Sequence, residues 1–149
     1  MKVAGQNWDI KEVDWNLRHD VLSEIRKQVF IIEQQVPQEE EWDGRDGSAT
    51  HWLATLKNGV PVGTARLLQN GQIGRMAVLA PYRKLGIGFA MLAMAVEKAA
   101  AMGMKTVHLH AQSHAIGFYE RAGFHVIGEE FLEAGIKHRM MEKLTDITN

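Results

Sequence analysis

The chain has 149 residues, 46% of them hydrophobic, no cysteine, and a formal net charge of −1 from 17 Lys and Arg against 18 Asp and Glu. This length predicts a single domain over residues 1–149, and the lack of cysteine excludes disulfides, a thiolate zinc site and a cysteine nucleophile. The balanced charge gives no reason to expect nucleic-acid or membrane partners, and with neither a secretory signal nor an apolar run of about 18 residues we expect a cytoplasmic location.

The first half of the chain predicts one helix followed by a three-stranded meander. Apolar residues at every fourth position, with Asp14 as the N-cap, predict an amphipathic helix over residues 15–31. The segment from Glu33 to Asp46 carries six acids and one base, and we expect it to be a loop. Runs typical of strands follow at residues 51–56, 62–68 and 73–79, separated by Asn-Gly turns at 58–59 and 70–71.

The second half of the chain alternates helices and strands. An Ala- and Met-rich run at residues 89–104 is apolar nearly all round, which predicts a buried central helix that ends at Gly103. A strand over residues 106–111 and a short helix over residues 114–122 follow. Two more strands are expected at residues 124–128 and 136–144. This order of elements predicts an α/β (α+β) fold in which helices cover a mixed sheet.

The loop before the central helix carries the most chemical information. The string Arg83-Lys84-Leu85-Gly86-Ile87-Gly88 places two cations and two glycines at a helix N-terminus. Unpaired N–H groups there, approached closely across glycine backbone, can hold a pyrophosphate without a metal. The chain contains no P-loop string, and the dinucleotide-binding pattern G-x-G-x-x-G/A fails at Met91. By itself the loop is equally consistent with an ordinary turn between a strand and a helix.

Further motifs accompany this loop in a fixed order. They are VFIIEQQVP, HWLA, GRMAVL, HAQSHAIGFYERAGF and GIKHRMMEK. Through these motifs the chain resembles the GCN5-related N-acetyltransferases (the GNAT superfamily), and within this superfamily the small bacterial ElaA/YjcF-like branch. The residues Arg83, Gly86 and Gly88 match the superfamily motif R/Q-x-x-G-x-G/A. The later motif N-x-x-A-x-x-x-Y-x-x-x-G-F is matched by Ala115, Tyr119, Gly123 and Phe124, with Gln112 in place of the usual asparagine.

The resemblance implies the GNAT fold: a twisted mixed sheet with an antiparallel N-terminal meander and two parallel strands that splay apart, flanked by helices. It implies that acetyl-CoA binds between the splayed strands as co-substrate, with no metal. A backbone N–H near Ala77 and Val78 would stabilise the oxyanion. The residues implied for binding the coenzyme are Met76, Ala77, Val78, Arg83, Lys84, Leu85, Gly86, Ile87, Gly88, Phe89, Gln112, Ala115, Phe118 and Tyr119.

The resemblance also implies direct attack of a primary amine on the thioester in a ternary complex. Tyr119 would be the general acid that protonates the departing thiolate, which suits a phenol with a reference pKa of about 10. The amine must lose a proton before it attacks, and Glu33 and His138 are the candidate bases, with water as the alternative. A helix-end carboxylate and a packed histidine are the structural interpretations of these two residues. The candidates for substrate binding are Glu33, His51, Arg75, His110 and His138.

Several alternatives stay open at this point. Histidines 108, 110 and 114 lie close in sequence, but their spacing matches no strong metal signature, so we expect no metal site. The acidic segment is either a solvated loop or an attraction for a cationic acceptor. The expected function is N-acetyl transfer to a small-molecule amine, and a non-catalytic or regulatory acyl-CoA-binding module is the alternative. The identity of the acceptor and the oligomeric state are open, although dimers are common in the superfamily.

Overall fold

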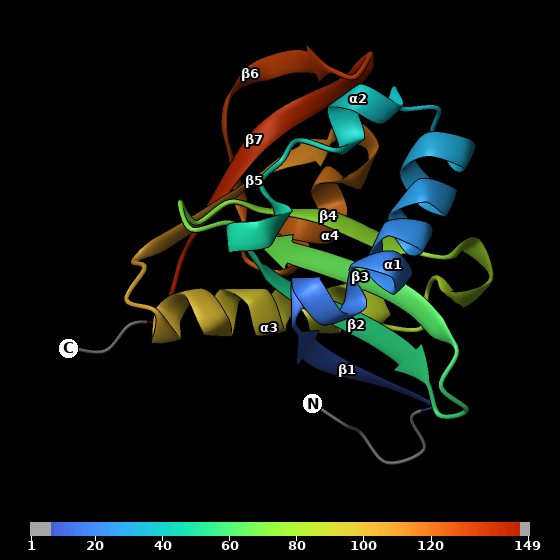
Figure 1. Ribbon diagram of the computed structural model, residues 1–149. Helices are drawn as coiled ribbons and strands as arrows, with labels where there is room; N and C mark the ends of the chain where they lie inside the picture. The colour runs from blue at the N-terminus through green and yellow to red at the C-terminus, as the bar shows by residue number, and fades with distance from the viewer. Residues whose placement is uncertain (1–6, 147–149) are drawn as a thin grey trace.

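The computed structural model describes residues 7–146, which form two antiparallel sheets (Figure 1). The first sheet has the strand order β1 (Trp8–Val13), β2 (Thr50–Leu56), β3 (Pro61–Leu67) and β4 (Ile73–Val78). The second sheet has the strand order β5 (Thr106–Gln112), β7 (Ile136–Leu144) and β6 (His125–Glu133). Strand β5, at the edge of the second sheet, lies next to β4, at the edge of the first.

The two sheets meet where β4 and β5 lie side by side. Within residues 7–146 these strands pair only at one isolated parallel bridge, between Gln72 and His108, and the N–H of His108 donates to the carbonyl oxygen of Gly71 at 3.1 Å. The backbone groups of β4 that face β5 beyond this bridge have no ladder partner there. The predicted mixed α/β architecture, with an antiparallel meander and a parallel neighbour, is confirmed.

Helices cover both faces of the first sheet (Figure 1). The helical elements are α1 (Trp15–Arg26), η1 (Lys27–Glu33), α2 (Gln38–Glu41), η2 (Asp46–Ser48), η3 (Ala80–Tyr82), α3 (Ile87–Ala101), η4 (Ser113–Ala115) and α4 (Ile116–Arg121). Successive residues of a strand point to opposite faces. Trp52 of β2 accordingly packs in the core with α3, whereas Leu53 packs with Leu22 and Ile25 of α1. Helix α3 buries one face in the larger core and leaves another face exposed, so the prediction of a helix buried on nearly all sides is wrong. The exposed positions are Phe89, Ala93, Glu97 and Ala101.

The structure differs from the predicted elements in several places, and the acidic segment expected to be a loop contains the short helix α2. Strand β1 was not predicted, although Trp8 and Ile10 are buried and alternate with more polar residues, as in a strand with one buried face. The helix predicted over residues 15–31 is two elements, because the chain widens into the π-helix η1, where the N–H of Gln34 donates to the carbonyl oxygen of Val29. Strand β6 continues five residues beyond the predicted end at 128, to Glu133.

Candidate active site

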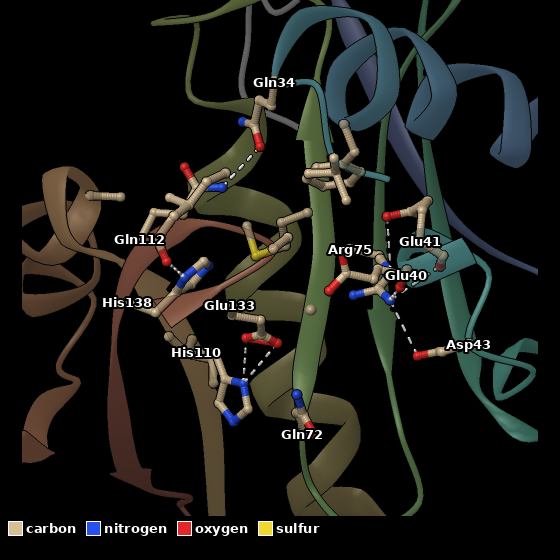
Figure 2. Close-up of a pocket in the computed structure, with 18 of the residues that line it drawn as sticks. Gln34, Glu40, Glu41, Asp43, Gln72, Arg75, His110, Gln112, Glu133 and His138 are labelled. Carbon is tan, nitrogen blue, oxygen red and sulfur yellow. Dashed lines mark hydrogen bonds and ion pairs between the residues drawn. The ribbon is translucent and has the colours of Figure 1, made fainter. Parts of the chain in front are cut away.

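A cavity of about 530 Å³ lies between the two sheets, at the point where β4 and β5 separate (Figure 2). Its walls come from η1, α2, β4, β5, the α4 region and the β6–β7 hairpin. Ligand pockets typically have volumes of about 300–1,000 Å³, so the cavity can accept a small molecule. The residues singled out from the sequence that line it are Arg75, Met76, His110, Gln112, Ala115, Tyr119 and His138.

Tyr119 of α4 is half-buried in the wall of this cavity. Its ring packs edge-on against Phe118 and Phe124, at centroid distances of 5.1 and 6.2 Å. Burial raises the pKa of Tyr119 to about 12, because the phenolate would lose its hydration. The hydroxyl group therefore stays protonated at neutral pH and is available as a proton donor.

His138 of β7 lines the same cavity and is only 8% exposed. Its Nδ1 atom lies 2.7 Å from the carbonyl oxygen of Ile136, and its ring stacks on Phe131 at a centroid distance of 5.8 Å. A carbonyl oxygen can only accept, so Nδ1 carries the proton and Nε2 of the neutral ring keeps its lone pair. No residue between 7 and 146 hydrogen-bonds to Nε2. This nitrogen is therefore free to accept a proton.

Two polar contacts order the walls around these residues (Figure 2). Gln112 Nε2 donates to Gln34 Oε1 at 2.9 Å, which ties the end of β5 to the end of η1. His110 Nδ1 lies 2.9 Å from the carboxylate of Glu133, the last residue of β6. The hydrogen bond with His110 lowers the pKa of Glu133, so this carboxylate is ionised at neutral pH. Sequence analysis missed Glu133, because only the β6–β7 hairpin brings it beside β5.

Three arginines and three carboxylates form a closed ring of ion pairs beside the cavity, called the charged ring below. Its members, in order around the ring, are Arg26, Glu41, Arg75, Asp43, Arg66 and Asp46, with nitrogen–oxygen distances from 2.6 to 3.2 Å. Each member contacts two residues of opposite charge, so the charged ring is neutral as a whole. The ion pairs offset the cost of burying these charges, although the Nε atoms of Arg66 and Arg75 have no hydrogen-bond partner among residues 7–146.

The charged ring holds α2 against the first sheet. Arg75 lies at a bulge between β3 and β4 with a left-handed φ of 48°, and bulges redirect side chains in this way. Its Nη2 atom donates to the carbonyl oxygens of Glu40 and Glu41 at 3.3 and 3.1 Å. The segment from Glu33 to Asp46 is thus largely tied to arginines. This finding replaces the expectation of a solvated acidic loop.

Glu33 and Arg83 form an ion pair with each other, and neither residue lines the cavity. Both oxygens of Glu33 accept from Arg83 at 2.7 Å, and Arg83 Nε donates to the carbonyl oxygen of Val78 at 2.8 Å. The hydrogen bond from Arg83 lowers the pKa of Glu33, which makes this carboxylate a weaker base. The structure therefore does not bring Glu33 together with Tyr119 and His138.

The loop before α3 has the geometry of an anion-binding turn. Lys84 and Gly86 both adopt left-handed backbone, with φ of 66° and 89°. Helix α3 begins at Ile87, and the N-cap Gly86 supplies no side-chain hydrogen bond. The first N–H groups of this helix are therefore left for another acceptor. A Cβ on Gly88 would lie 3.6 Å from Phe118, so the loop, Phe118 and the exposed Phe89 are neighbours at one end of the site.

His51 lies in the core, away from the cavity. It is 1% exposed, its Nε2 lies 2.9 Å from the carbonyl oxygen of Asp46, and its ring stacks on Trp15 at 4.8 Å. Burial lowers the pKa of His51, so the ring is neutral. The structure thus gives His51 a packing role beside the charged ring and does not bring it to the candidate acceptor site.

Within residues 7–146, no three His, Asp or Glu side chains are grouped so that they could hold a metal ion. No helix in this part of the chain is long and apolar enough to cross a membrane.

Known proteins share both the sequence pattern and the architecture. The family model for the acetyltransferase (GNAT) domain matches residues 18–145. YjcF of Bacillus subtilis, named an uncharacterized N-acetyltransferase, is 39% identical over 124 residues, which cover 80% of this chain and 87% of that protein. The crystal structure of Escherichia coli ElaA has a TM-score of 0.80 at 28% identity, over 91% of this chain and 99% of that one. An acyl-CoA N-acyltransferase from Pseudomonas aeruginosa has a TM-score of 0.76 at 29% identity, over 92% and 98%.

Proposed function

The chain belongs to the GNAT acetyltransferase family, and we propose that it moves an acetyl group from acetyl-CoA to a primary amine. The observation that carries this proposal is the shared cavity of Tyr119 and His138, which offers a protonated phenol and an unpaired imidazole nitrogen beside the gap between β4 and β5. These are the two groups that direct aminolysis of a thioester needs.

The coenzyme would lie in the gap between β4 and β5. Backbone groups of Met76, Ala77 and Val78 that face the gap would bind the pantetheine arm. The N-terminus of α3, with Lys84 ahead of it, would bind the pyrophosphate. Arg83 is already held by Glu33 and Val78, so it would order this loop or exchange partners when the coenzyme binds.

The proton transfers would be divided between two residues. Nε2 of His138 takes a proton from the acceptor amine, whose nitrogen attacks the carbonyl carbon of the thioester. A backbone N–H near Ala77 and Val78 stabilises the negative charge on the carbonyl oxygen. As the C–S bond breaks, the Tyr119 hydroxyl gives its proton to the thiolate sulfur. The high pKa of Tyr119, about 12, keeps the proton in place until the thiolate forms.

A thiol-release assay tests the proposal directly. The purified chain is incubated with acetyl-CoA and a panel of primary amines, and free CoA thiol is measured; the protein contributes no thiol background, since it has no cysteine. We expect turnover with at least one amine and its loss in Tyr119→Phe. Tight binding of acetyl-CoA without thiol release for any amine would instead support a non-catalytic acyl-CoA-binding module.

A further inference from the structure

The charged groups around the cavity either belong to the charged ring or lie outside it. Arg75 is the one arginine among the cavity-lining residues that the structure describes, and it is held by Glu41 and Asp43 in the charged ring. An acceptor carboxylate would have to displace one of these ion pairs to reach the guanidinium. Outside the charged ring, three carboxylates of the cavity have no arginine or lysine partner among residues 7–146: Glu39, Glu40 and Glu133.

Glu133 is the cavity carboxylate that hydrogen-bonds to His110, next to the wall formed by His138. Figure 2 shows it between the wall of His110 and His138 and the wall of Arg75. Its nearest partner is His110, at 2.9 Å, and both imidazole rings of that wall pack on Phe131. The hydrogen bond from His110 lowers the pKa of Glu133, so its negative charge persists at neutral pH.

The reactive groups line the same cavity as Glu133. His138 is more than nine-tenths buried, and its Nε2 has no partner within residues 7–146. A ligand placed with its reacting nitrogen at His138 and Tyr119 would therefore extend past a carboxylate in the same cavity. The Glu133 side chain is 45% exposed, so water screens part of its charge, but opposite charges a few ångströms apart still attract each other.

We propose that the acceptor is a linear diamine or polyamine, with one amine acylated at Tyr119 and His138 and a second, protonated amine bound by Glu133. This inference rests on the proposed N-acyltransferase activity, whose acceptor it specifies. Glu39 and Glu40, both exposed on α2, add negative charge where a longer polyamine would leave the cavity. Glu133 is then a specificity-determining residue that does not take part in the chemical step.

Three acceptors of the same chain length test the proposal: pentylamine, 1,5-diaminopentane and 5-aminopentanoate. We expect kcat/KM for the diamine to exceed that for the monoamine at least tenfold, and the amino acid to be the poorest acceptor. Glu133→Gln keeps the size of the side chain and removes its charge. It should lower the ratio of diamine to monoamine kcat/KM about tenfold, which corresponds to about 1.4 kcal/mol.

A matched control is available on α3. Glu97 is exposed, does not line the cavity and makes no ion pair with any residue from 7 to 146, so Glu97→Gln should leave the ratio unchanged. Equal kcat/KM for all three acceptors, or a preference for 5-aminopentanoate, would overturn the proposal. The latter result would assign acceptor binding to Arg75.

A binding measurement separates this proposal from the activity on which it rests. If no amine is acylated, titration calorimetry with 1,5-diaminopentane in the presence of CoA still reports on the cavity. Diamine binding that weakens at least tenfold in Glu133→Gln would support cation recognition while the acyltransfer proposal failed. No diamine binding, or equal binding by Glu133→Gln and the parent chain, would refute cation recognition by Glu133.

Discussion

Replacing Arg26 by methionine should destabilise the protein severely, since it removes one corner of the charged ring. The Arg26 side chain is fully buried, and it donates to Glu41 Oε2 at 2.6 Å and to Asp46 Oδ1 at 2.7 Å. Methionine fills the space of the aliphatic stem, but it removes the guanidinium that now lies over the rings of Trp15 and Trp42. The cost therefore reports on the loss of the charged group together with its contacts.

The magnitude follows from these contacts. A hydrogen bond to a charged group is worth roughly 1.5–3 kcal/mol, so two of them amount to about 3–6 kcal/mol. Glu41 and Asp46 each keep one arginine, Arg75 at 3.2 Å and Arg66 at 3.0 Å, which places the loss toward the middle of this range. We expect Arg26→Met to lower the free energy of unfolding by about 3–5 kcal/mol, as is typical when one partner of a buried ion pair is removed.

Urea denaturation followed by circular dichroism measures this loss, and a thermal scan should show Tm lower by about 10 °C. Lys98→Met is the matched control, since it removes the exposed partner of Glu12, 3.2 Å away, and should cost less than about 1 kcal/mol. If Arg26→Met costs no more than Lys98→Met, the charged ring does not hold the structure together and the reasoning fails.

Four further changes test the site and the fold. Tyr119→Phe should lower kcat at least about 100-fold while acetyl-CoA affinity, measured by calorimetry, stays the same; equal turnover would remove this hydroxyl as the acid. Gly86→Asp combines a strained φ of 89° with negative charge and should weaken CoA binding at least tenfold, whereas unchanged affinity would place the pyrophosphate elsewhere. His138→Ala should shift the rise of kcat/KM to higher pH, because solvent must then take the proton, and an unchanged pH profile would assign the base to water. Burial alone would raise the pKa of Asp43, but its hydrogen bonds and arginine neighbours lower it from 3.8 to about 2. The stability that this ionised carboxylate supplies is therefore present above pH 4 and lost as the pH falls toward 2. In Asp43→Asn, the free energy of unfolding should accordingly fall less steeply with decreasing pH.

The elements that local pattern specifies were predicted closely. The strand predicted over residues 136–144 has the observed bounds, and the two Asn-Gly turns separate β2, β3 and β4 as expected. Strand β1 was missed even though its alternation was readable. The division of the first helix into α1 and η1 was not predictable, because the shift to wider hydrogen bonding leaves no periodic signal in so short a segment.

Contacts between distant parts of the chain could not be predicted from one sequence. Arg26 lies 15 residues from Glu41 and 20 from Asp46, and only the pairing of β3 with β4 brings the other two arginines to the same carboxylates. Tyr119 and His138 line one cavity, and the resemblance to the family motifs is what singled them out from the sequence. Glu133 belongs to no motif, and its role depends on the length of the β6–β7 hairpin.

The neutral charged ring has a consequence for how this protein can diverge. The charges that hold α2 in place are matched among themselves, whereas the cavity carboxylates Glu39, Glu40 and Glu133 belong to no such set. Substitutions at these three positions can change which acceptor is attracted without disturbing a buried ion pair. If the proposed acceptor recognition holds, evolutionary substitutions at these three positions change the preferred acceptor while the buried ion pairs keep the fold stable.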